Sequence, residues 1–141
     1  MRERLIGTWR LVSYETIEPG GRRAKPFGDA VGRLSYDECG NMSGQVMRPR
    51  RGRVELGEGN AQQVRAAYTG YIAYFGTYEV AADNRSVVHH VQGALNPAWV
   101  GGDQVRGMRF DGDRLVLHAD VTKGDIVVRH VLTWEKASEG A

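Results

Sequence analysis

The chain has 141 residues, of which 41% are hydrophobic and 26% are charged, and its formal net charge is +2 at pH 7. This length predicts one domain, residues 1–141, that is large enough to bury a core. So small a net charge gives no reason to expect a nucleic-acid or membrane partner. The N-terminal residues lack the apolar stretch of a signal peptide, and no run reaches the roughly 20 apolar residues of a membrane span, so we expect a cytoplasmic protein.

The first third of the chain has the pattern of short strands joined by turns. Apolar and polar residues alternate over residues 8–16, and two further strand-like stretches, residues 32–36 and 42–47, flank a turn at residues 38–41. These patterns predict a strand followed by a hairpin.

Residues 60–75 have a different period. Apolar and aromatic residues recur there at the spacing of one helix face, and they are Val64, Ala67, Tyr68, Tyr71, Ile72 and Phe75. Asn60 is placed as the N-cap. Gly70 weakens the expected helix by about 1 kcal/mol relative to alanine. We therefore predict one short amphipathic helix over residues 60–75.

The second half of the chain returns to strands. The predicted strands cover residues 76–80, 86–95, 104–110, 114–120 and 126–135, with turns at residues 83–84, 111–113 and 123–124. About eight strands joined mostly by hairpins can stack as two sheets or close into a barrel, and closure removes exposed edges. An antiparallel up-and-down barrel is favoured, with an interior wide enough for side chains or one small ligand.

Several segments resemble a known family. The element Gly7-Thr8-Trp9 opens the first strand, and the similarity extends from Gly7 to Lys136 through the segments "GTWRLVSYE", "PFGDAVGRLSYDECGNMS", "YIAYFGTYEV", "VVHHVQGALNPAWVG", "QVRGMRFDGDRLVL" and "VLTWEK". Together they resemble the bacterial and fungal lipocalin-like domain family. The resemblance implies an all-β barrel in which Trp9 packs across the floor against a basic residue of the last strand, for which Arg129 is the candidate. Because members range from uncharacterised proteins to catalysts of natural-product pathways, the resemblance leaves the function open.

Alternation along the strands predicts which side chains face the interior. Arg106 shares a face with Met108 and Phe110, and Tyr78 shares one with Gly76 and Val80. His89 lies with Val87 and Val91, whereas its neighbour His90 lies with Gln92. We therefore expect His89 to point inward and His90 to face solvent.

These inward groups are the centre of the predicted site, and the pattern of residues 42–47 leaves open which way Gln45 faces. We assign catalytic roles to His89, Arg106 and Tyr78, and ligand-binding roles to Gln45, Tyr74, Met108, Phe110 and Trp99. A buried arginine needs a carboxylate, carbonyls or an anionic ligand, because an unpaired buried charge is costly. The alternative is structural: His89 as a bonded core histidine, Tyr78 as filler, and Arg106 paired with a strand-end carbonyl.

Other chemistry has little support in the sequence. Cys39 is the only cysteine, so no disulfide and no thiolate metal site is expected. His118 and His130 offer two metal ligands without a clear third, and we predict neither a metal nor a cofactor. The arginines between residues 48 and 53 are interpreted as a solvated loop.

Two functions fit these features. In the first, the protein is a cofactor-free enzyme that catalyses an isomerisation, cyclisation or elimination in natural-product metabolism, with His89, Tyr78 and Arg106 moving protons or holding an oxyanion. In the second, it is a carrier that only binds the molecule. The partner in both is a small, largely apolar molecule with a carbonyl or acidic group, and a homodimer is left open. The excess of arginine over lysine favours a high-GC bacterial source.

Overall fold

The computed structural model describes residues 1–55 and 59–138. The strands are β1 (Gly7–Ile17), β2 (Arg23–Ala24), β3 (Val31–Tyr36), β4 (Asn41–Met47), β5 (Tyr71–Val80), β6 (Ser86–Ala94), β7 (Asp103–Asp111), β8 (Arg114–Lys123) and β9 (Ile126–Lys136). The helical elements are α1 (Arg2–Leu5), α2 (Ala61–Thr69) and the 3₁₀ turn η1 (Pro97–Trp99).

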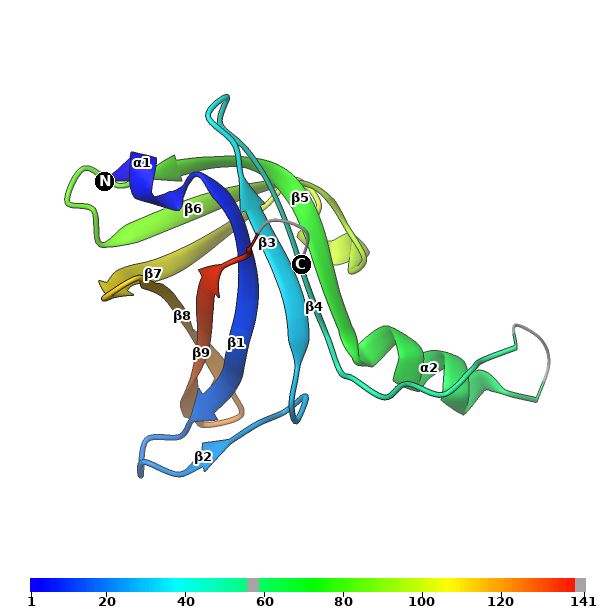
Figure 1. The fold of residues 1–141 in the computed structure, drawn as a ribbon. Helices are drawn as coiled ribbons and strands as arrows, with labels where there is room; N and C mark the ends of the chain where they lie inside the picture. The colour runs from blue at the N-terminus through cyan, green and yellow to red at the C-terminus, as the bar shows by residue number, and fades with distance from the viewer. Residues whose placement is uncertain (56–58, 139–141) are drawn as a thin grey trace.

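The strands form a closed antiparallel barrel (Figure 1). Each strand from β3 to β8 pairs with the strand that follows it, and β1 closes the ring because it pairs with β3 on one side and β9 on the other. The two-residue strand β2 adds to the end of β1 and stands outside the ring. The predicted all-β, eight-stranded, up-and-down barrel is confirmed.

Trp9 lies at one end of the barrel, beside α1. Its side chain is 2% exposed, and its indole Nε1 donates a hydrogen bond to the backbone oxygen of Leu5 at 2.8 Å. The ammonium of Lys136, from the last strand, lies 4.7 Å from the centre of the indole ring. The basic partner predicted for Trp9 was therefore the wrong residue, because Arg129 instead donates to Asp120 at 2.9 Å. This end of the barrel is closed by packing.

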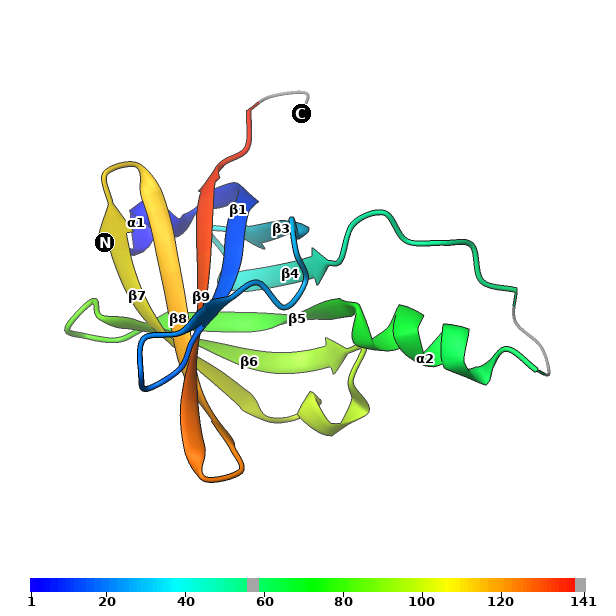
Figure 2. The same ribbon diagram turned by 90° about the horizontal axis from the view of Figure 1, so that it is seen from below.

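The helix is shorter than predicted. It ends at Thr69, and the backbone N–H of Gly70 bonds to the carbonyls of Ala66 and Tyr68. From Tyr71 onward the chain belongs to β5, where Tyr71 pairs with Met47 of β4. No residue of α2 is buried, and the helix extends away from the barrel (Figure 2). Asn60 occupies the N-cap position without a side-chain cap bond.

A β-bulge between β5 and β6 shifts the alternation of β6. Phe75 pairs with Gly93 and Gly76 pairs with Val91, so Gln92 is the extra residue. Before the bulge, Val91 is buried along with Val87 and His89. The first part of β6 therefore presents an imidazole to the interior, as alternation predicted.

Candidate functional site

A cavity of about 520 Å³ occupies the barrel interior at the end opposite Trp9. Most of its wall is apolar, supplied by residues that include Leu34, Val46, Ile72, Leu117 and Leu132. Its polar side chains come from seven strands and η1, and they include Tyr14, Gln45, Tyr74, His89, Trp99, Gln104, Arg106, Asp120, His130 and Trp134. An apolar cavity with a few polar groups is the usual form of a small-molecule site.

His89 is held between two phenols. Its side chain is 2% exposed; Nε2 lies 2.7 Å from the Tyr36 hydroxyl and Nδ1 lies 2.6 Å from the Tyr74 hydroxyl. Burial, with smaller contributions from the charges of Arg106 and His90, lowers the pKa of His89 to about 3. The ring is therefore neutral at physiological pH.

The inward orientation predicted for His89 is confirmed, and so is the outward orientation of His90. The imidazole Nδ1 of His90 lies 2.7 Å from the carboxylate of Asp103 at the barrel surface. The hydrogen bond with Asp103 raises the pKa of His90.

Arg106 is the cation of the cavity wall. Its guanidinium donates to the backbone oxygen of Val105 at 3.1 Å and to the side-chain oxygen of Gln104 at 2.7 Å. Within residues 1–55 and 59–138, no carboxylate lies within 4.0 Å of it. Asp120 borders the same cavity but pairs with Arg129. Arg106 therefore has neutral hydrogen-bond acceptors and, in the described part of the chain, no carboxylate close enough to form an ion pair.

A second phenol–imidazole pair lies on the opposite part of the wall. The Tyr14 hydroxyl is 2.7 Å from Nδ1 of His130, and the Tyr14 ring packs edge-on against Phe27. Burial raises the pKa of Tyr14 and lowers the pKa of His130, and the charge of Arg106 lowers the His130 pKa further. Both residues line the cavity, and Nε2 of His130 has no hydrogen-bond partner among the described residues.

Two tryptophans complete the polar wall. Trp99 of η1 packs edge-on against Tyr74, with ring centres 6.1 Å apart. Trp134 is 3% exposed, and its indole N–H has no hydrogen-bond partner among the described residues. A buried donor without a partner is uncommon, and in this position it adds a hydrogen-bonding group beside the cavity.

The sequence profile of the lipocalin-like domain family matches residues 6–137. The chain belongs to the lipocalin-like domain family. A relative from Aspergillus oryzae, named as a 4'-hydroxy-3'-methoxypropiophenone carrier protein, is 36% identical over 107 residues. That match covers 67% of this chain and 96% of the relative.

This lipocalin-like barrel brings together some of the predicted site residues. His89, Arg106, Tyr74, Trp99 and Gln45 border the cavity. The Gln45 side chain, however, is exposed and accepts a hydrogen bond from the Tyr71 hydroxyl. Their roles in binding or catalysis stay predictions.

Three predicted site residues lie outside the cavity lining. Tyr78 is buried, and its hydroxyl donates to the backbone oxygen of Asp37 at 2.6 Å. Met108 belongs to the core, and Phe110 packs against Trp9 with ring centres 6.4 Å apart. These residues face inward as alternation predicts, but they lie toward the closed end, because alternation specifies a face and not a depth.

Sequence reasoning missed Tyr36, Tyr14 and His130 as members of the site region. Tyr36 lies on the same face of β3 as the apolar residue Leu34, and His130 lies on the same face of β9 as Leu132 and Trp134. This shared face was the signal in the sequence that could have identified them. His130 was considered only with His118 as a metal ligand. The two histidines lie on opposite faces of the sheet, since the His118 ring covers Gly107 on the outer surface. Among the described residues, no three His, Cys, Asp or Glu side chains form a metal-binding group.

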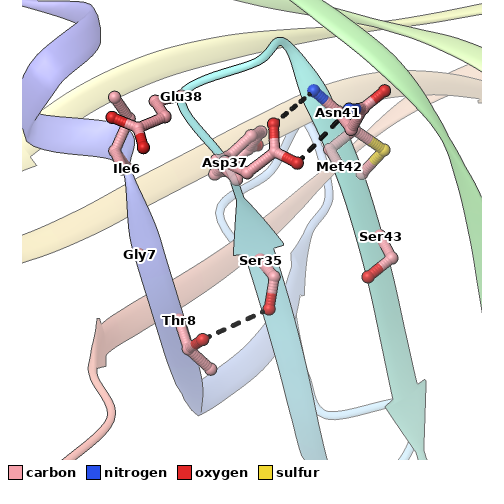
Figure 3. Close-up of a pocket in the computed structure, with 10 residues that line it drawn as sticks. Ile6, Gly7, Thr8, Ser35, Asp37, Glu38, Asn41, Met42 and Ser43 are labelled. Atoms are coloured by element: carbon pink, nitrogen blue, oxygen red, sulfur yellow. Dashed lines mark hydrogen bonds between the residues drawn. The ribbon is translucent and has the colours of Figure 1, made fainter.

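A second hollow lies outside the barrel, at the end near Trp9 (Figure 3). It measures about 590 Å³ and is lined mostly by exposed or half-buried residues. Some of its polar groups bond to one another: Asp37 accepts from the backbone N–H of Asn41 at 2.8 Å, and Thr8 bonds to Ser35 at 3.4 Å. This hollow therefore encloses a ligand less than the barrel cavity does.

None of the helices in the described part of the chain has the length and apolar character needed to cross a membrane.

Proposed function

We propose that this chain binds a small, largely apolar molecule with a carbonyl or acidic group inside its barrel. The observation that carries the proposal is Arg106, a cation on the wall of a mainly apolar cavity with no carboxylate within 4.0 Å among the described residues. Keeping a partly buried charge without a counter-charge is costly, and a bound oxyanion or polarised carbonyl offsets that cost. The guanidinium is thus the anchor for the ligand's oxygen.

The relative from Aspergillus oryzae supports a specific ligand class. The molecule in its name, 4'-hydroxy-3'-methoxypropiophenone, combines an aromatic ring with a ketone. A cavity of about 520 Å³ has the size of a typical small-molecule pocket. Its aliphatic wall suits the ring and Arg106 suits the ketone oxygen. Aryl ketones are therefore the first ligands to test, with the chain acting as a carrier.

Calorimetric titration with 4'-hydroxy-3'-methoxypropiophenone tests this function. Replacing Arg106 with Met should weaken binding by about 10-fold to 100-fold, because a hydrogen bond to a charged group contributes roughly 1.5–3 kcal/mol. Arg109→Met is the matched control, since Arg109 is exposed on the same strand. Equal affinity of the two variants would show that Arg106 does not anchor the ketone.

Catalysis is the second candidate function. The observation that favours it is the free ring nitrogen of His130 among the described residues. Both nitrogens of His89 are engaged by tyrosine hydroxyls, whereas Nε2 of His130 has no hydrogen-bond partner among the described residues. In a cofactor-free isomerisation, cyclisation or elimination, His130 would remove a proton from the carbon next to the carbonyl, and Arg106 would hold the resulting enolate oxygen. In this candidate function, His130 takes the role of base that the sequence predicted for His89, and Arg106 keeps its predicted role.

Deuterium exchange measures this proton removal directly. In D₂O, the protein should accelerate loss of the proton NMR signal from the methylene group next to the ketone of 4'-hydroxy-3'-methoxypropiophenone. His130→Gln should reduce the acceleration by about 10²-fold to 10⁴-fold, whereas His118→Gln, on the outer face, should not change it. A bound ketone that exchanges no faster than in buffer would leave the carrier function alone.

The remaining predictions rest on the sequence. They are a single domain over residues 1–141, a cytoplasmic location, a role in natural-product metabolism, a homodimer and a bacterial source. The relative named above is fungal, so it does not support the last of these.

A further inference from the structure

Tyr36, His89 and Tyr74 form a hydrogen-bonded chain that runs from the core to the cavity wall. Tyr36 is 2% exposed and does not line the cavity, whereas Tyr74 is half-buried and does. The two hydroxyls bond to opposite nitrogens of one neutral imidazole. Such a ring has one N–H donor and one lone pair, so one tyrosine must donate to it and the other must accept from it.

Burial decides which tyrosine donates. Among the described residues, the Tyr36 hydroxyl has a single hydrogen-bond partner, Nε2 of His89. If Nε2 carried the proton, the Tyr36 hydroxyl hydrogen would be buried without an acceptor, which costs roughly 1–3 kcal/mol. Tyr36 therefore donates to Nε2, and the imidazole proton is on Nδ1.

The position of the Tyr74 proton follows from this tautomer. Nδ1–H of His89 donates to the Tyr74 oxygen, so the hydrogen of the Tyr74 hydroxyl does not point at the ring. Tyr74 borders the cavity, as does Arg106, whose charge partly opposes the rise in the Tyr74 pKa that burial causes. A neutral donor and a cation thus face the same space.

We infer that the Tyr74 hydroxyl donates a hydrogen bond to the ligand's oxygen alongside Arg106, and that Tyr36 and His89 are positioning residues that turn its proton into the cavity. This inference rests on the proposed function for the ligand's chemistry. It assigns His89 a role that needs no change of protonation. It also makes Tyr36, which does not touch the cavity, a determinant of selectivity for ligands that carry an oxygen acceptor.

The tautomer of His89 tests the inference without any ligand. In ¹⁵N-labelled protein, correlations between the ring carbon-bound protons and the two ring nitrogens distinguish a protonated nitrogen from one with a lone pair. We expect Nδ1 protonated and Nε2 unprotonated. The reverse assignment would overturn the inference, because Tyr74 would then donate to His89 and not to a ligand.

Binding tests the consequence. Each variant is titrated with 4'-hydroxy-3'-methoxypropiophenone and with 2-methoxy-4-propylphenol, in which a methylene replaces the carbonyl. Tyr74→Phe should lower the ketone-to-methylene affinity ratio by about threefold to tenfold, the size of one neutral hydrogen bond. Tyr36→Phe should lower the ratio in the same direction, and the double variant should lose no more than Tyr74→Phe alone.

Tyr78→Phe is the matched control, because it removes another buried phenol hydroxyl that is not part of the chain. It should leave the affinity ratio unchanged. An unchanged ratio in Tyr74→Phe, with the parent protein binding the ketone, would overturn the inference and leave the proposed function standing. An unchanged ratio in Tyr36→Phe alone would overturn the positioning role. If the parent does not bind the ketone, the proposed ligand is wrong, and the His89 tautomer decides the inference alone.

Discussion

His89 shows what alternation along a strand can and cannot predict about a residue. Its inward face followed from the apolar residues Val87 and Val91 on either side of it. Its hydrogen bonds could not be predicted from these neighbours, because Tyr36 and Tyr74 come from β3 and β5 and contact the ring only when the barrel has closed. The sequence therefore predicts that an imidazole is enclosed, whereas its chemistry depends on contacts between distant segments.

Neutral burial of His89 makes stability depend on pH. The pKa of about 3 in the folded protein lies below the unfolded value of roughly 6.5. Between these values the unfolded chain binds the extra proton, so the free energy of unfolding decreases as the pH falls, by at most about 1.4 kcal/mol per pH unit. His89→Gln should reduce the slope between roughly pH 4 and pH 6 by the His89 contribution, as measured by urea unfolding at each pH, while the contribution of His130, whose pKa burial also lowers, remains.

His90 provides the control for this measurement. Asp103 raises the pKa of His90, so its contribution is present at low pH and is lost as the pH rises through the folded-state pKa. The pH range in which the His90 contribution to stability changes therefore lies above the pKa of an unfolded histidine. His90→Gln should leave the slope between roughly pH 4 and pH 6 unchanged. If His89→Gln and the parent share one slope, His89 is not held neutral by burial.

At the scale of elements, the junction of α2 and β5 was the part that sequence periodicity misread. Tyr71, Ile72 and Phe75 continue the helical spacing of the preceding residues, but they lie on a strand with apolar side chains on both faces. Such a strand matches a helical pattern by chance over a few residues. The β5–β6 bulge was also not predicted, because Gln92 looks like an ordinary outward residue of an alternating strand.

At the bulge, the backbone of β6 leaves no space for a side chain at Gly76. A β-carbon built there would lie 1.8 Å from the backbone oxygen of His90, a contact that only backbone movement can relieve. Gly76→Ala should therefore destabilise the protein by about 1–3 kcal/mol or more in urea unfolding. Gly20→Ala is the control, because a β-carbon there has no atom within 4 Å and should change stability little. Similar midpoints for both variants would show that the strands do not approach this closely.

At the scale of the whole molecule, the barrel divides into a packed end and a hollow end. Trp9, Phe110 and Met108 fill the end near α1, and the cavity occupies the other. The sequence predicted closure and the inward faces, because strand count and alternation are local properties. It did not separate packing residues from lining residues, since depth along the barrel depends on strand stagger.

The packed end should carry much of the stability. Trp9→Ala removes a buried indole that is 2% exposed, and it should destabilise the protein by about 3–5 kcal/mol, with ligand selectivity unchanged in the folded fraction. Val127→Ala, at a site that is 50% exposed on β9, is the control and should cost about 0.5 kcal/mol or less. A Trp9→Ala variant that unfolds at the same urea concentration as the parent would contradict the packed floor.

The most direct test of a ligand site in the hollow end is a crystal structure of the protein with 4'-hydroxy-3'-methoxypropiophenone. We expect density for the ketone inside the barrel, with its carbonyl oxygen within hydrogen-bonding distance of the Arg106 guanidinium and the Tyr74 hydroxyl. Density for the ketone only in the outer hollow beside Asp37, or an empty barrel at saturating ketone, would contradict the account.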